Sequence, residues 1–180
     1  MSDAPSPIRV ALIGLRGTGK STVGPLLADR LDVAFRDSDA VLAELAGRSA
    51  DDLLTFEGEP TLREWEARAV ADIARSDGVV ALGGGAPLLE ENRLQLQGWL
   101  VVLLDAPDSV LIDRIARDRA EGGPTRPALS EHPLAEELPR LRERRFTLYR
   151  SFANVSVSTA DRTPSEVVDE ILGHLAPSPR

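Results

Sequence analysis

Residues 14–21 constrain the fold of this chain more than any other segment. They read Gly-Leu-Arg-Gly-Thr-Gly-Lys-Ser, which fits the phosphate-binding loop (P-loop) pattern G-x-x-x-x-G-K-[ST]. An apolar run at 8–13 precedes the loop and predicts a strand, and the residues at 21–31 predict a helix after it. The sequence therefore predicts a strand, a phosphate-binding turn and a helix in direct succession.

Each residue type in this loop has a physical reason. Glycines allow a positive φ and bring bare backbone N–H groups close to phosphate oxygens. The helix that follows directs its positive end at the same anion. We expect Lys20 to reach the β- and γ-phosphates and the Ser21 hydroxyl to bind Mg²⁺. A glycine turn that binds nothing is the alternative, but Lys20 is the only lysine among 21 basic residues, which favours the phosphate site.

Composition limits the remaining possibilities. We expect 180 residues to form a single domain, 1–180, with flexible tails at 1–7 and 176–180. A net charge of −8 argues against a general nucleic-acid surface. The chain has no cysteine and no apolar stretch near the ~20 residues that span a membrane. We therefore expect a cytoplasmic protein without a nucleic-acid or membrane partner.

Short apolar runs alternate with helical patterns along the whole chain. Strands are predicted at 8–13, 33–36, 79–82, 99–104 and 155–157. Helices are predicted at 21–31, 40–46, 50–56, 60–76, 88–97, 108–117, 134–152 and 164–175. This alternation predicts an α/β fold of three layers, α/β/α, with a five-stranded parallel sheet.

Two segments interrupt this regular pattern. Pro25 lies inside the first predicted helix, where it removes a backbone hydrogen bond, so we expect it to kink or loosen that helix. The segment at about 117–134 is polar and rich in glycine and proline. Its length is typical of a mobile lid loop.

Three polar features follow strand ends, where a parallel sheet binds its ligands. Asp37 and Asp39 could divide the work between Mg²⁺ and an acceptor hydroxyl, or they could form a capped turn; the P-loop favours the first interpretation. The triplet at 83–85 could let a substrate approach bare backbone, or it could be a plain loop. Asp105 ends the fourth predicted strand and could point to the same edge, but we expect it to cap the helix that opens at Pro107.

The arginines and histidines allow weaker statements. Arg63 lies among three glutamates, so surface ion pairing is its simplest interpretation. We expect most of the arginine run at 140–150 to be a solvated face, with one or two members free to bind an anionic substrate. His132 and His174 lack ligand-type partners in the sequence, which predicts no metal site built on them.

Together these residues resemble the shikimate kinase family, in the nucleoside-monophosphate-kinase-like P-loop group, from Val10 to about Leu175. The order and approximate spacing of several motifs match that family. They are the P-loop at 14–22, Asp37-Ser38-Asp39, Gly58-Glu59 with Leu62-Arg63 and Glu66, the turn at 82–85, Arg126-Pro127, and 145–149. The chain departs from the family at Leu62, usually Phe, at Thr147, usually Pro, and in a longer lid. These departures concern the lid and the acceptor pocket, not the reaction class.

The resemblance implies a monomeric P-loop kinase with a lid loop, which transfers the ATP γ-phosphoryl group to the 3-hydroxyl of shikimate in chorismate and aromatic amino acid biosynthesis. It implies Mg²⁺ held by Ser21 and, through water, Asp37, with Lys20, Asp39 and Arg126 as catalytic residues. The implied nucleotide-binding residues are Gly17, Thr18, Gly19, Lys20, Ser21, Thr22, Arg114, Arg126 and Arg162. The implied shikimate-binding residues are Asp39, Arg63, Gly84, Gly85 and Arg145.

Two other functions need consideration. A kinase for another small hydroxylated acid, such as gluconate, would keep the fold with a different acceptor pocket; Arg63, Arg145 and the glycine triplet argue against it. A nucleotide switch would need a base-recognition motif of the Asn-Lys-x-Asp kind. Because Lys20 is the only lysine, that motif is absent from the sequence.

Overall fold

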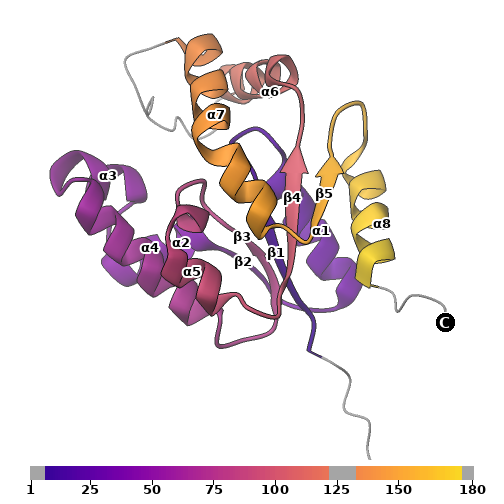
Figure 1. Ribbon diagram of the computed structural model, residues 1–180, viewed down its shortest axis with the longest axis horizontal. Coiled ribbons are helices and arrows are strands. Elements are labelled where there is room, and N and C mark those ends of the chain that lie inside the picture. Colours follow the sequence, from indigo (N-terminus) through magenta and orange to yellow (C-terminus); the bar gives the residue numbers. More distant parts are fainter. Residues whose placement is uncertain (1–6, 122–132, 176–180) are drawn as a thin grey trace, which may run out of the picture.

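A single parallel sheet forms the centre of the protein (Figure 1). The computed structural model describes residues 7–121 and 133–175. The strands are β1 (Arg9–Ile13), β2 (Phe35–Asp37), β3 (Gly78–Ala81), β4 (Leu100–Asp105) and β5 (Val155–Ser158). They pair in the order β2-β3-β1-β4-β5, and every pairing is parallel. The predicted five-stranded parallel sheet is therefore confirmed, with β1 in the middle.

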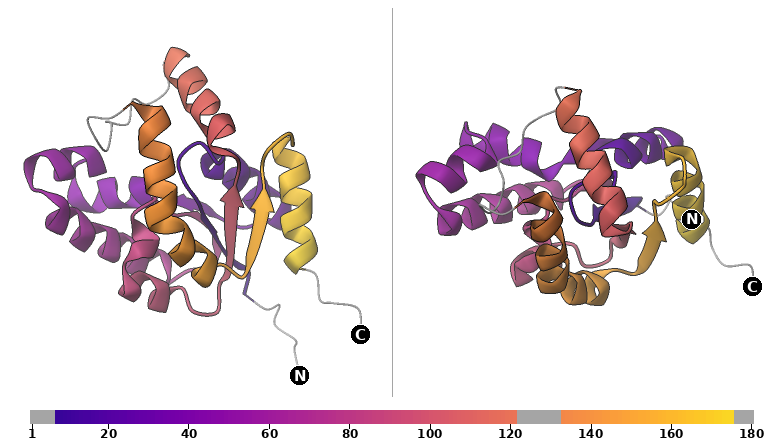
Figure 2. Two further views of the ribbon diagram at one scale, coloured as in Figure 1. Left: turned by 45° about the horizontal axis from the view of Figure 1, so that its top comes forward. Right: turned by 90° about the horizontal axis from the view of Figure 1, so that it is seen from above.

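Helices cover both faces of this sheet. They are α1 (Lys20–Leu31), α2 (Ser38–Ala46), α3 (Ala50–Phe56), α4 (Glu59–Ile73), the short 3₁₀ helix η1 (Ala86–Leu88), α5 (Glu90–Gln95), α6 (Asp108–Ala120), α7 (Leu134–Phe152) and α8 (Pro164–Leu175). Helices α1 and α8 lie on one side, and α5 and α7 on the other (Figure 2). The three-layer α/β/α prediction is confirmed.

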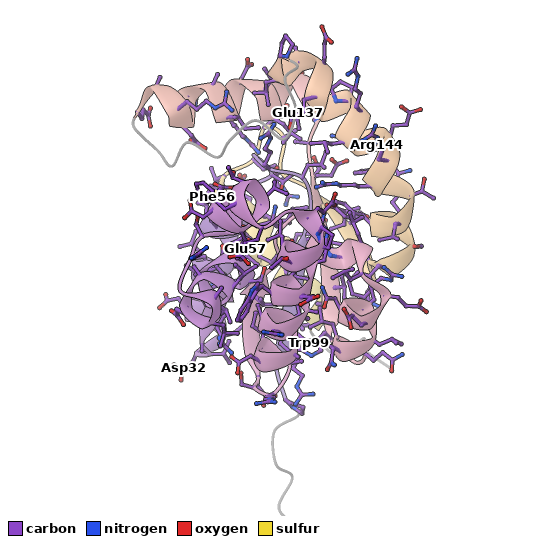
Figure 3. All side chains as sticks on the ribbon, turned by 90° about the vertical axis from the view of Figure 1, so that its left-hand side faces the viewer. Asp32, Phe56, Glu57, Trp99, Glu137 and Arg144 are labelled. Atoms are coloured by element: carbon purple, nitrogen blue, oxygen red, sulfur yellow. The ribbon has the colours of Figure 1, made fainter. Side chains whose placement is uncertain are left out.

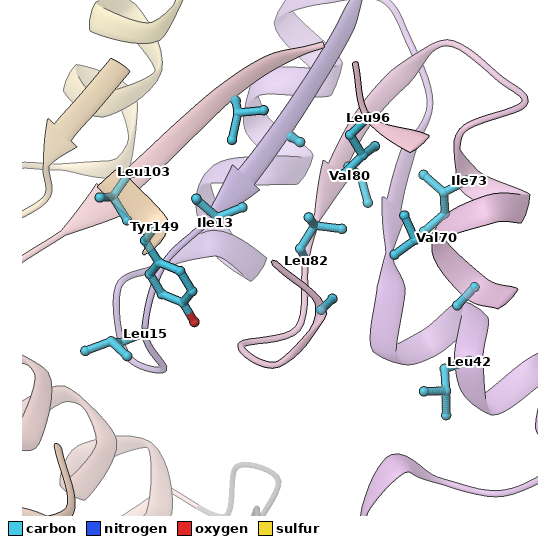
Figure 4. Packing of buried hydrophobic residues seen from close by; sticks show 14 of the residues in the cluster. Ile13, Leu15, Leu42, Val70, Ile73, Val80, Leu82, Leu96, Leu103 and Tyr149 are labelled. Carbon is cyan, nitrogen blue, oxygen red and sulfur yellow. The ribbon is translucent and has the colours of Figure 1, made fainter. Parts of the chain in front are cut away.

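The side-chain alternation of β1 explains why both faces are covered. Val10 and Leu12 pack under α1 and α8, whereas Ala11 and Ile13 face the opposite layer, and all four are fully buried. A strand that is apolar on both faces must be covered on both. Figure 4 shows the second layer, where Ile13 meets residues from β3, β4 and α7, such as Tyr149.

Several boundaries differ from the sequence predictions. Helix α1 begins one residue earlier than predicted and runs without a break from Lys20 to Leu31, with Pro25 inside it. Helix α2 begins at Ser38, earlier than predicted, because the Asp37 side chain caps it by accepting a 2.9 Å hydrogen bond from the Asp39 N–H. Helix α6 continues to Ala120, and the predicted lid otherwise falls mainly on 122–132, outside the described residues. No helix within 7–121 and 133–175 is long and apolar enough to cross a membrane.

A close approach between α1 and β2 gives the first prediction. A Cβ at Gly24 would overlap the Phe35 ring, so Gly24→Ala should destabilise the fold by about 1–3 kcal/mol through overpacking. Gly173→Ala in α8 is the matched control, since its Cβ would enter open space and stabilise the helix by about 0.5–1 kcal/mol. Urea unfolding of both variants checks this, and a stabilised Gly24→Ala would contradict the packing described here.

Candidate active site

The P-loop lies at the point where the strand order of the sheet reverses. It follows β1, whose two neighbours are β3 on one side and β4 on the other. Ligands of open α/β sheets bind at such a switch point, outside the carboxyl ends of the strands. Gly14, Gly17 and Gly19 have φ values of 147°, 80° and 91°, which side chains rarely allow. The backbone conformation that the motif demands is therefore present.

Polar contacts hold this loop in shape. The Thr18 side chain is fully buried, and its hydroxyl donates a 2.7 Å hydrogen bond to the Leu15 carbonyl. The Lys20 ammonium donates to the carbonyls of Gly14 and Leu15, at 2.8 and 3.0 Å, and so lies over the loop. The long, flexible lysine side chain can exchange these carbonyl contacts for phosphate oxygens.

A cleft of about 710 Å³ opens beside the loop and collects most of the predicted nucleotide-binding residues. The predicted residues that line it are Gly17, Thr18, Gly19, Lys20, Ser21, Thr22, Asp37, Asp39, Arg114 and Arg162. Arg114 is fixed by hydrogen bonds of 2.9 and 2.6 Å to the Thr159 hydroxyl and carbonyl, and Arg162 is paired with Glu170. Arg126, predicted in the lid, lies outside the described residues.

The glycine triplet at 83–85 forms a second centre next to this cleft. The Gly84 carbonyl accepts hydrogen bonds from the Arg145 guanidinium, at 3.0 Å, and from the Tyr149 hydroxyl, at 2.6 Å. The Gly83 N–H donates to the buried Ser38 hydroxyl at 2.8 Å. The triplet is thus tied to α7 on one side and to the start of α2 on the other.

Three side chains approach the triplet so closely that no Cβ would fit. A Cβ at Gly83 would overlap the Asp39 carboxylate, and one at Gly85 would overlap the Arg63 guanidinium. A Cβ at Gly84 would lie 2.9 Å from Arg145 Nη1. The structure therefore brings Asp39, Arg63 and Arg145 together around bare backbone, and Asp39 also lines the neighbouring phosphate cleft.

Arg63 is anchored by two glutamates of its own helix. It donates to Glu66 Oε2 at 2.5 Å and to Glu59 Oε1 at 2.7 Å. Glu59 is largely exposed, whereas the Glu66 side chain is only 9% exposed. The surface ion pairing predicted for Arg63 therefore describes only the pair with Glu59, because the second partner, Glu66, is buried beside Gly85.

Burial and neighbouring charges shift the pKa values of Arg63, Glu66 and Tyr149. Desolvation raises the pKa of Glu66 above its ordinary value, and the nearby Asp39 charge adds to this, although Arg63 and Arg145 oppose it. Burial likewise raises the pKa of Tyr149. For Arg63, burial acts to lower the pKa, but the two glutamates outweigh it, and the pKa is raised. Arg63 thus carries a permanent positive charge into the cluster.

The contacts of Arg142 near the site were not predicted from the sequence. Arg142 was expected on a solvated face, but it donates to Asp105 at 2.8 Å, to Asp108 at 2.6 Å and to the Ala106 carbonyl at 2.6 Å. Asp105 therefore binds Arg142 and does not cap α6, which has no side-chain cap. The acidic residues on either side of Pro107 were the available signal, because two neighbouring carboxylates favour a shared cationic partner.

The phosphate cleft offers few side chains that could bind a divalent cation. Within the described segments, no group of three or more His, Cys, Asp or Glu residues could hold a metal ion. Ser21 and Asp37 line the phosphate cleft together, and both offer oxygen. Mg²⁺ usually takes one or two such protein ligands and completes its shell with water and phosphate oxygens, so this donor set fits it.

The fold and this pair of adjoining centres define a P-loop kinase. The family model described as shikimate kinase matches residues 16–176. The chain belongs to the shikimate kinase family, and it is a kinase.

Individual relatives agree with this assignment. The chain is 42% identical over 170 residues to a shikimate kinase of Pseudomonas syringae pv. tomato, covering 93% of this chain and 96% of the relative. The solved shikimate kinase from Acinetobacter baumannii in complex with shikimate has a TM-score of 0.85 at 30% identity and covers 94% and 93% of the two chains. A Sinorhizobium meliloti gluconokinase, with a TM-score of 0.57 and 22% identity over 94% and 91% of the two chains, shares the fold alone.

The raised pKa of Glu66 gives a pH prediction. A carboxyl group with a raised folded-state pKa stabilises the fold fully below its ordinary pKa of 4.5, and this contribution is lost as the pH rises through the folded-state value. Glu66→Gln cannot titrate, so its free energy of unfolding should rise relative to wild type as the pH increases from 4.5. Urea unfolding over a pH series measures this difference, and a difference that stays constant or falls would contradict the shift.

Proposed function

We propose that this kinase transfers the γ-phosphoryl group of ATP to the 3-hydroxyl of shikimate, with Asp39 between the two half-sites. The observation that carries the proposal is the position of Asp39, which lines the phosphate cleft and also packs against Gly83 of the acceptor centre. A carboxylate at that junction is placed to orient an attacking hydroxyl and to accept its proton.

Arg63 and Arg145 are proposed to bind the carboxylate of shikimate, with Gly84 and Gly85 against its ring. Arginine binds carboxylates through paired N–H donors, and two arginines converge on this turn. The ion pair between Arg63 and Glu59 is largely exposed on the glutamate side, so a substrate carboxylate can replace Glu59 at small cost. Glu66, buried behind Arg63, holds the guanidinium in place meanwhile.

The phosphate end of the reaction is assigned to the P-loop. Lys20 and the backbone of 17–22 would bind the ATP phosphates, and Arg114 and Arg162 would flank the adenine. Mg²⁺, held by Ser21 and through water by Asp37, would neutralise phosphate charge. Arg126 is proposed to act from the lid, on the family resemblance alone. The cytoplasmic location and the monomeric state expected from the sequence stay predictions.

The role of Asp39 can be tested with an isosteric change. Asp39→Asn removes the proton acceptor and should lower shikimate-dependent ADP release by about 100-fold or more, because general-base catalysis contributes at least that much. Binding of a non-hydrolysable ATP analogue should persist. Asp29→Asn, on the exposed face of α1, is the control. Turnover of Asp39→Asn near the wild-type rate would remove Asp39 from the mechanism.

The proposed carboxylate-binding role of Arg145 predicts different effects on the KM values for shikimate and ATP. Arg145→Met should raise the KM for shikimate about tenfold or more, because it removes a charge-assisted hydrogen bond, and leave the KM for ATP unchanged. Arg144→Met, one residue earlier and exposed, should alter neither constant. Steady-state kinetics of both variants measure this, and an equal effect on the two KM values would argue against the assignment.

The acceptor itself can be identified with the unmodified protein. ADP release should be stimulated by shikimate but not by gluconate or nucleoside monophosphates. Faster release with gluconate would favour the alternative kinase for another hydroxylated acid. Tight ATP binding without stimulation by any acceptor would favour a nucleotide switch.

A further inference from the structure

A buried ion pair joins the P-loop to α7. The Arg16 guanidinium, through Nη2, donates to Oε1 of Glu137 in the first turn of α7. Their side chains are only 12% and 5% exposed. Figure 3 shows Glu137 near the end of α7 that lies beside α6. Arg16 stands within the G-x-x-x-x-G-K-[ST] motif, at a position where the pattern specifies no residue type.

Stability alone does not explain this pair. Burying two charges costs desolvation energy that their attraction barely repays, and an apolar pair of similar volume often stabilises a protein as well or better. The Arg16 guanidinium is also poorly satisfied. Its Nε is buried and has no hydrogen-bond partner within residues 7–121 and 133–175, although buried donors are paired almost everywhere in proteins. A buried cation with unused donors beside a phosphate site points to an anionic ligand.

The position of Arg16 in the cleft indicates which anion this is. Arg16 lines the same cleft as Lys20 and Arg114. Arg114 is bound to Thr159, just beyond β5. Arg16 is held instead by the first turn of α7. The Lys20 ammonium, the group that reaches the β- and γ-phosphates in a P-loop, contacts the carbonyl of Leu15, the residue next to Arg16. Arg16 therefore stands in the part of the loop that faces the terminal phosphoryl group of ATP.

We propose that the Arg16 side chain is a further phosphate-binding residue of this site, which contacts the terminal phosphoryl group of ATP while Glu137 holds its guanidinium. This inference rests on the proposed function for the nucleotide site. Glu137 also balances the charge of Arg16 in the absence of nucleotide. The terminal phosphoryl group supplies acceptors for the donors of Arg16 that Glu137 leaves unused.

The experiment compares two nucleotides by titration calorimetry. Arg16→Met keeps an unbranched, flexible side chain similar to the aliphatic part of arginine and removes the charge and the donors. It should weaken binding of a non-hydrolysable ATP analogue about tenfold or more, the loss expected for a charge-assisted hydrogen bond. ADP, which lacks the terminal group, should bind within about threefold of wild type. Arg30→Met is the matched control: it breaks an exposed ion pair between Arg30 of α1 and Asp169 of α8, and it should change neither affinity.

A double variant separates phosphate binding from a structural role. Arg16→Met alone leaves Glu137 buried without its partner and so destabilises the fold, whereas Arg16→Met with Glu137→Gln leaves no lone buried charge. The double variant should bind the analogue as poorly as Arg16→Met and ADP as well as wild type. If it binds the analogue like wild type, the pair is structural and the inference fails. Equal weakening of ADP and the analogue would overturn the contact with the terminal group.

The same titrations distinguish this inference from the proposed function. Wild-type protein that binds neither nucleotide would refute the nucleotide site and the inference together. Wild-type protein that binds both, with a double variant indistinguishable from it, would refute only the role of Arg16.

Discussion

The acceptor half of this kinase depends on a turn that has no side chains. The residues at 83–85 expose bare backbone at the end of β3, and groups from three different helices approach it. Asp39 comes from α2, Arg63 from α4 and Arg145 from α7. A methyl group at Gly83 or Gly85 would occupy the space of a charged group that we assign to the reaction. The absence of three side chains thus allows a compact cluster of charges.

Helix α7 connects this turn to the rest of the site. Glu137 in its first turn pairs with the P-loop, and Arg142 pairs with Asp105 and Asp108 where β4 leads into α6. Nearer its end, Arg145 and Tyr149 bind the Gly84 carbonyl. One helix therefore fixes both halves of the site relative to each other. Catalysis of phosphoryl transfer rests largely on such positioning, together with charge stabilisation.

The features that local sequence patterns determine were predictable. The P-loop motif, the apolar strands and the alternation of strands with helices led directly to the parallel sheet and to the nucleotide cleft. The motifs shared with the shikimate kinase family led to Arg63, Arg145 and the glycine triplet, which the structure places around one turn. Because parallel strands carry their carboxyl ends to one edge, residues far apart in sequence could be assigned to one site.

The remaining contacts depend on tertiary packing and leave little local trace. Ser38 looks like an ordinary helix-start residue, yet its hydroxyl accepts a hydrogen bond from Gly83, 45 positions away. The partner of Arg16 is 121 positions away and stands in a helix whose arginine run was expected to be mostly solvated. Arg142 was misread for the same reason, since periodicity shows which residues are polar but not which polar residues are buried in pairs.

The close approach at the glycine triplet can be tested directly by measuring shikimate affinity in Gly85→Ala. Gly85 has a φ of −89° and a ψ of −30°, which alanine adopts readily, so only the added methyl group matters. That methyl group would overlap the Arg63 guanidinium and lie 2.8 Å from Glu66 Oε1. Shikimate binding should therefore be weaker by about tenfold or more, with unchanged ATP-analogue binding. Shikimate affinity within about twofold of wild type would contradict it.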